Sequence, residues 1–187
     1  MTDSQNFKVT KLDAAQRQLR TAILLWFSGG DPISIHSLAY AAYEVIHAIS
    51  KRHNPQRRDL LFDSRFIREE ARSEFNKLLK MHANFFKHAN RDANDTIEFS
   101  PMISETFILH GILGLDACSM PKSDEEVAFA SWLFLHDIEL LTQEGREMFA
   151  NIISIDDFNE MRRMSKPQFL EEVRMGRAEL RRLGQLS

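Results

Sequence analysis

Residues 12–32 read L-D-A-A-Q-R-Q-L-R-T-A-I-L-L-W-F-S-G-G-D-P, and this stretch decides the fold class. Its apolar residues recur every three or four positions, which is the spacing of the buried face of an α-helix. Gly29-Gly30 predicts the end of that helix. Asp31-Pro32 predicts the start of the next one, because aspartate caps helix N-termini and proline is tolerated in a first turn. The residues of the buried face are Leu12, Ala15, Leu19, Ala22, Ile23, Trp26 and Phe27.

Helical stretches and helix-breaking residues follow one another along the rest of the chain as well. The five prolines and seven glycines fall between stretches of helical periodicity. This pattern predicts an all-α, single-domain helical bundle of about five main helices with a charged C-terminal helix. We expect residues 1–141 to form the bundle core and residues 142–187 to form a helical extension that packs on the bundle or on a partner subunit. The helices are expected at 12–27, 32–50, from Asp63 or Ser64 into 81–92, 101–115, 123–141 and 166–182.

Composition sets limits on the class of protein. The chain has 187 residues, of which 43% are hydrophobic and 27% charged, so it can bury a core and is not a disordered chain. A formal charge of −3 gives no overall attraction to nucleic acid or acidic lipid. The single cysteine, Cys118, has no partner for an internal disulfide, and no apolar run is long enough for a signal peptide or a membrane span. We therefore expect a cytoplasmic protein that does not enter the membrane.

The chain lacks the common nucleotide-binding and hydrolase motifs. A glycine-rich phosphate loop, a Gly-x-Ser-x-Gly elbow and a dinucleotide fingerprint are all absent from the sequence. This absence excludes the usual nucleotide-using enzymes, and no cofactor is predicted.

Residues 81–92, M-H-A-N-F-F-K-H-A-N-R-D, carry the densest set of candidate catalytic side chains. If the helix continues through this segment, Asn84, Lys87, His88 and Arg91 fall on one polar face, while Phe85 and Phe86 anchor the helix to the core. A histidine beside fixed positive charge suits proton transfer at a phosphodiester. The alternative is a solvated helix end, where cations favour the C-terminal dipole.

Part of this segment resembles the HEPN superfamily of prokaryotic helical domains. The family motif has an arginine, then commonly asparagine, three variable residues and a histidine; Asn84 and His88 match, whereas Ala83 replaces the arginine. The resemblance implies a homodimer that brings two motifs together, and either metal-independent ribonuclease activity or a role as an inactive binding module. The missing arginine favours the binding module. Asp31-Pro32, residues 36–42 and residues 84–89 also resemble a group of bacterial helical proteins to which we attach no activity.

The second expected helix carries a candidate binding stripe. Its polar and aromatic residues have one-face helical spacing, and they include both tyrosines of the chain. Glu44-Val-Ile-His47 also has the Glu-x-x-His spacing of metal sites in helical bundles, but no second copy of that motif exists. The alternatives are a core edge with hydroxyls bonded to Glu44 or a histidine, and a polar partner to the His88 face. The stripe consists of His36, Tyr40, Tyr43, Glu44 and His47.

These features leave three hypotheses for function. The first is a HEPN-like protein that binds RNA or a partner in a stress or defence setting, with ribonuclease activity as an additional possibility. The second is a metalloprotein or small-molecule-binding protein built on His36, Glu44 and His47, completed by His88, His110 or His136. The third is an interaction module without site chemistry. His110, His136 and Cys118 are otherwise expected to be packed core residues.

Overall fold

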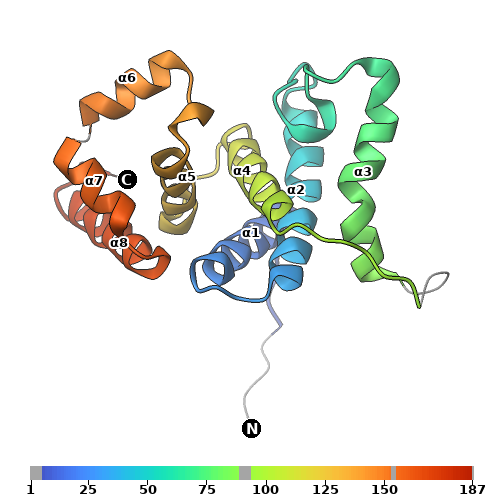
Figure 1. Cartoon of the computed structure of the whole chain (residues 1–187), viewed down its shortest axis with the longest axis horizontal. Coiled ribbons are helices and arrows are strands. Elements are labelled where there is room, and N and C mark those ends of the chain that lie inside the picture. The colour runs from blue at the N-terminus through green and yellow to red at the C-terminus, as the bar shows by residue number, and fades with distance from the viewer. Residues whose placement is uncertain (1–5, 89–93, 153–154, 187) are drawn as a thin grey trace, which may run out of the picture. The chain divides into compact units, whose positions relative to one another are not determined.

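The computed structural model describes residues 6–88, 94–152 and 155–186, without the side chains of 148–152 and 155. Helices make up the secondary structure of these residues and no strand occurs among them, so the predicted all-α class is confirmed (Figure 1). Two single-turn 3-10 helices, η1 (Leu61–Asp63) and η2 (Ile138–Leu140), lie between the longer ones. The α-helices are α1 (Lys11–Phe27), α2 (Pro32–His53), α3 (Glu69–Lys87), α4 (Met102–Asp116), α5 (Asp124–His136), α6 (Gln143–Ile152), α7 (Ile155–Arg163) and α8 (Lys166–Arg182).

The chain divides into two compact units. Unit 1 comprises residues 1–22 and 31–120, and unit 2 comprises residues 23–30 and 121–187, so that α1 supplies residues to both. The division along the chain falls after Met120, whereas the sequence placed the end of the core at residue 141. The physical reason is that α5 packs mainly on α8 and therefore belongs with the C-terminal helices.

In unit 1, α2 packs chiefly on α4, and α3 lies along another side of α2 (Figure 1). Glycines allow the close approach of α4 to its neighbours. A Cβ atom on Gly114 would lie 2.5 Å from Cγ2 of Ile46, and one on Gly111 would lie 3.1 Å from Cδ1 of Leu19. Gly114 thus lets α4 lie close to α2, and Gly111 lets it lie close to α1.

Helix ends with local signals were predicted correctly. The Asp31 carboxylate accepts a hydrogen bond of 2.7 Å from the Ser34 amide and caps α2, which follows at Pro32. Ser123 and Glu126 form a capping box at the expected start of α5, and the charged helix α8 spans the expected residues. In each of these caps, the two bonded residues lie within four positions of each other in the sequence. The cap therefore forms without a contact to a distant part of the chain.

Helix α3 corrects the sequence prediction at both ends. It begins at Glu69 rather than at a cap on Asp63 or Ser64, because the Asp63 carboxylate is bound by Lys51 and His47. Phe66 lies before the helix and is 81% exposed. The helix ends at Lys87, and His88 has an extended backbone with φ −128° and ψ 126°.

Unit 2 is held by an aromatic core and by ion pairs between α5 and α8. The ring of Trp132 packs against Phe169 with centroids 5.2 Å apart, and Phe169 is fully buried. The Arg174 guanidinium donates a 2.7 Å hydrogen bond to the buried Glu125 carboxylate. Apolar packing and this partly buried ion pair together fix α8 against α5.

Candidate functional site

His36, the first residue of the predicted α2 stripe, lies in the interior of unit 1. It is fully buried, and its Nδ1 is 3.2 Å from the Ser104 hydroxyl on α4. The rings of His82, Phe99 and Phe107 surround it, with centroids between 5.1 and 6.0 Å away. Burial lowers the pKa of His36 to about 4, with smaller contributions from His82 and Lys87. This histidine is therefore neutral near pH 7 and sits in an aromatic environment.

The two tyrosines of the stripe are also core residues. Tyr40 donates a 3.2 Å hydrogen bond to the Glu44 carboxylate, as the core-edge alternative predicted. The Tyr43 hydroxyl instead accepts a 3.2 Å hydrogen bond from the backbone amide of Phe62, a partner that the sequence spacing could not indicate. Burial raises the pKa of both phenols. Each tyrosine hydroxyl therefore has a hydrogen-bond partner within unit 1.

Glu44 and His47 are bound by different partners. The His47 Nε2 atom is 2.9 Å from the Asp63 carboxylate, which also accepts from Lys51, and burial lowers the pKa of His47 against the opposing effect of Asp63. Glu44 is exposed and lies 4.0 Å from the Lys80 ammonium. Within residues 6–88, 94–152 and 155–186, no three His, Cys, Asp or Glu side chains are grouped to hold a metal ion.

The secondary candidates also have local partners. The Nδ1 atoms of His110 and His136 each lie 2.9 Å from a backbone carbonyl oxygen four residues earlier. His136 is nevertheless exposed, with its ring stacked on Trp132, rather than packed in the core. Burial raises the pKa of the half-buried Cys118 thiol, which makes it a weak nucleophile.

The candidate catalytic residues of α3 do not share one face. Lys87 points toward α2, and its Nζ lies 4.8 Å from the centroid of the Tyr40 ring. Asn84 and His88 instead line a hollow on the other side of α3. Ala83, at the arginine position of the HEPN motif, is fully buried, and Arg91 lies outside the described residues.

The hollow on the outer side of α3 brings together two predicted residues and several that sequence reasoning missed. It has a volume of about 620 Å³. Leu78 is 56% exposed here, and Met81 is 43% exposed. The sequence does carry one indication of this surface. Leu78, Met81 and Phe85 have the spacing of an apolar stripe on α3, beside the stripe of the buried residues Leu79 and Ala83. The lining residues are Glu74, Lys77, Leu78, Met81, Asn84, Phe85, His88 and Ile97.

Comparisons with known proteins give no indication of the function of this chain. No family model matches the chain, and no curated protein or solved structure matches it. In the part of the chain that the structure describes, no helix combines the length and apolar character needed to cross a membrane.

Proposed function

We propose that the protein is a homodimeric interaction module without nuclease activity, which self-associates through the outer face of α3. The observation that carries this proposal is the apolar stripe of exposed Leu78, exposed Met81 and half-buried Phe85, which shares one hollow with Asn84 and His88. A contiguous apolar patch with a polar border is typical of a protein–protein interface. The polar residues at its border would set the register of the contact.

The stripe is complementary to itself when two copies of α3 lie antiparallel. A two-fold axis near Met81 places Leu78 opposite Phe85 of the partner subunit, because the two positions are nearly equidistant from Met81 along the helix. The same axis places Glu74 opposite His88 of the partner subunit, so that a carboxylate meets an imidazole. Leu78, Phe85, Glu74 and His88 would thus acquire partners in one symmetric arrangement.

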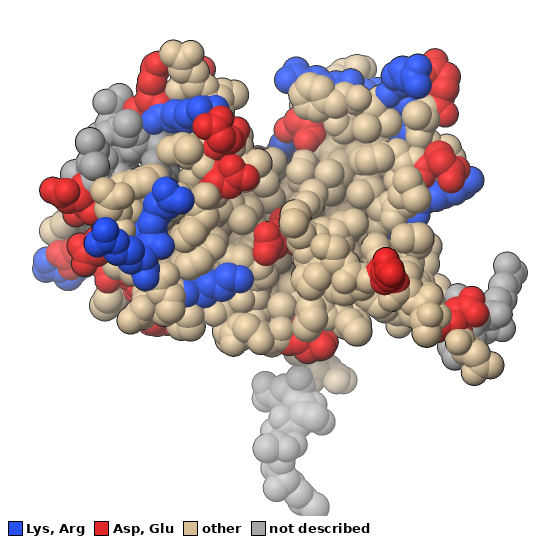
Figure 2. Space-filling model, viewed as in Figure 1, with Lys and Arg blue, Asp and Glu red and all other residues tan. Residues whose placement is uncertain are grey.

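The surroundings of Asn84 and His88 support binding over RNA cleavage. Stabilising a phosphoryl transition state requires a cation beside the histidine, but Lys87 lies over Tyr40 and Ala83 fills a core position. Among the described residues that line the hollow, the cation is Lys77, and its Nζ lies 3.1 Å from the Glu74 carboxylate. On the face shown in Figure 2, Lys and Arg are mixed with Asp and Glu, and such mixed charge favours a protein partner over the phosphate backbone of RNA.

Sedimentation velocity over a concentration series tests the dimer. The wild-type chain should sediment as a species of twice the 21.7 kDa chain mass. Met81→Glu should shift it to the monomer, because dimerisation would remove water from a charged carboxylate at the centre of the interface without giving it a partner. Met102→Glu is the matched control, since Met102 is 71% exposed on α4 and does not line the hollow. A wild-type monomer at all concentrations would contradict the proposal.

RNA binding is a separate outcome and is measured separately. A fluorescein-labelled single-stranded RNA of mixed sequence should show no saturable anisotropy change with the wild-type protein and should remain intact on a gel. Saturable binding that His88→Ala abolishes and His53→Ala retains would overturn the choice of a protein partner. His53 is a suitable control because it is an exposed histidine in the same unit, at the end of α2.

A further inference from the structure

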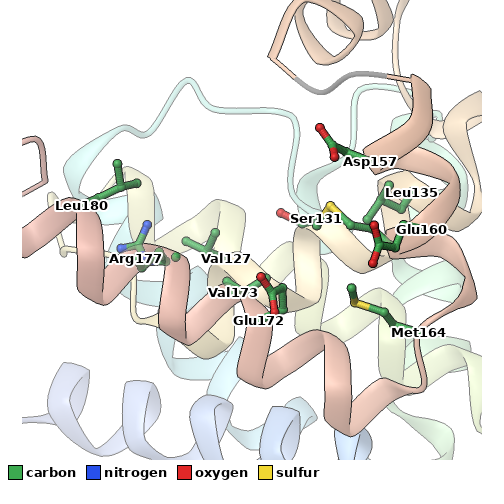
Figure 3. Close-up of a pocket in the computed structure, with 12 residues that line it drawn as sticks. Val127, Ser131, Leu135, Asp157, Glu160, Met164, Glu172, Val173, Arg177 and Leu180 are labelled. Atoms are coloured by element: carbon green, nitrogen blue, oxygen red, sulfur yellow. The ribbon is translucent and has the colours of Figure 1, made fainter.

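Unit 2 contains a second hollow, independent of the α3 face. It lies among α5, α7 and α8 and has a volume of about 650 Å³ (Figure 3). This volume is in the range of clefts that take up a ligand or several side chains of a peptide. We call it the α5–α8 groove and define it by Val127, Leu135, Glu160, Glu172 and Leu180.

The floor of the α5–α8 groove is apolar and adaptable. Val127 and Val173 lie in its middle in Figure 3, with Leu180 toward one end and Met164 toward the other. Leu180 is 41% exposed, so the groove leaves apolar surface in contact with solvent. Unbranched methionine side chains adjust to the shape of a bound segment, which is common at helix-binding surfaces.

The border of the groove is acidic. Figure 3 shows Asp157 and Glu160 at the end formed by α7, and Glu172 on α8 beside the apolar floor. Among the residues that the structure describes, Glu160 and Glu172 are exposed and form no ion pair. The cation on the groove, Arg177, is already bound 2.6 Å from the Asp124 carboxylate. The carboxylates of Glu160 and Glu172 thus remain available to a cationic ligand.

An adjoining hollow extends the same surface across α8. It has a volume of about 640 Å³ and shares Glu160, Met164 and Glu172 with the α5–α8 groove. Met175, which is 59% exposed, lines this second part. Arg163 also lines this second part, but the carboxylates on the combined surface outnumber its cations, Arg163 and Arg177.

We infer that the α5–α8 groove binds a cationic amphipathic helix of a partner protein. Apolar residues at i, i+3 or i+4, and i+7 of the partner helix would occupy the floor. Lysine or arginine residues flanking them would pair with Glu160 and Glu172. Charge complementarity selects this occupant, because an acidic or neutral helix would leave both carboxylates partly desolvated without a partner.

Fluorescence anisotropy with a defined probe tests this inference on the full chain. The probe is a labelled 18-residue helical peptide of lysine and leucine, and an otherwise identical peptide of glutamate and leucine is the control ligand. The lysine peptide should bind and the glutamate peptide should not. Glu160→Lys/Glu172→Lys should weaken binding about tenfold, because each substitution replaces an attraction by a repulsion. Leu180→Ser should also weaken it, since it removes part of the apolar floor.

A matched variant separates the groove from overall charge. Glu144→Lys/Glu147→Lys makes the same change in net charge at two exposed residues of α6 that do not line the groove, and it should bind the peptide like the wild type. Equal weakening by both double variants, or no binding of the lysine peptide, would overturn the inference. Self-association that Glu160→Lys/Glu172→Lys abolishes would also overturn it, because the occupant would then be a second copy of the chain. Circular dichroism confirms that each variant is folded.

Discussion

Acid should destabilise unit 1 through His36, and the size of the effect follows from its burial. The unfolded chain binds a proton on this residue near its ordinary pKa of 6.5, whereas the folded protein does so only near pH 4. The unfolded state therefore binds more protons between these values, so stability is lost as the pH falls from about 6.5 toward 4. Linkage gives a loss of about 2 kcal/mol between pH 7.5 and pH 5 from this one residue.

Urea denaturation at the two pH values measures this loss. His36→Asn removes the titrating ring but keeps a group that can bond Ser104, so the stability difference between pH 7.5 and pH 5 should shrink by about 2 kcal/mol relative to the wild type. His53→Asn, at an exposed position on the same helix, should leave the wild-type difference unchanged. An unchanged pH difference in His36→Asn would refute the reasoning. So would an NMR titration that places the His36 pKa near 6.5.

Three further substitutions should lower the free energy of unfolding, each measured by urea denaturation at pH 7.5. Gly114→Ala should cost about 1–3 kcal/mol, because its new methyl group overlaps Ile46; no loss would mean that α2 and α4 pack less closely. Ser123→Ala should cost about 1 kcal/mol by removing the cap of α5, and Ser123→Asp should restore it. Arg174→Ala should cost about 2 kcal/mol, below the value for a fully buried pair, because Glu125 is buried but Arg174 is one-third exposed. A neutral Arg174→Ala would contradict the structural role of this ion pair.

The parts of the fold that were predicted correctly depend on contacts within one or two helical turns. Asp31 and Ser123 cap their helices by bonding amides three residues away. Helix α3 could not be placed in the same way, because the candidate cap Asp63 is bound by Lys51 on α2, twelve residues away along the chain. Asp63 could either cap a helix or pair with a cation, and a tertiary contact that sequence spacing does not reveal decides between these two roles.

The candidate site shows the same limit. The α2 stripe was recognised as one face, and its burial around His36 follows from that spacing. The position of Asn84 and His88 away from Lys87 depends on where α3 ends, and the sequence gives no proline or glycine at Lys87 to mark this end. The exposure of Leu78 could not be predicted, because an apolar residue looks the same in the sequence whether its side chain packs inside one subunit or remains on the surface.

Disulfide trapping tests the antiparallel α3 dimer most directly. Helices packed about 8–10 Å apart bring facing Cα atoms within about 6 Å of each other, which a disulfide can span. With Cys118→Ser as the background, Met81→Cys places one thiol per chain at the proposed two-fold axis. Mild oxidation should then convert it to a covalent dimer, whereas Met102→Cys in the same background should form no covalent dimer. Absence of the Met81→Cys dimer, or equal trapping of both variants, would contradict the proposed interface.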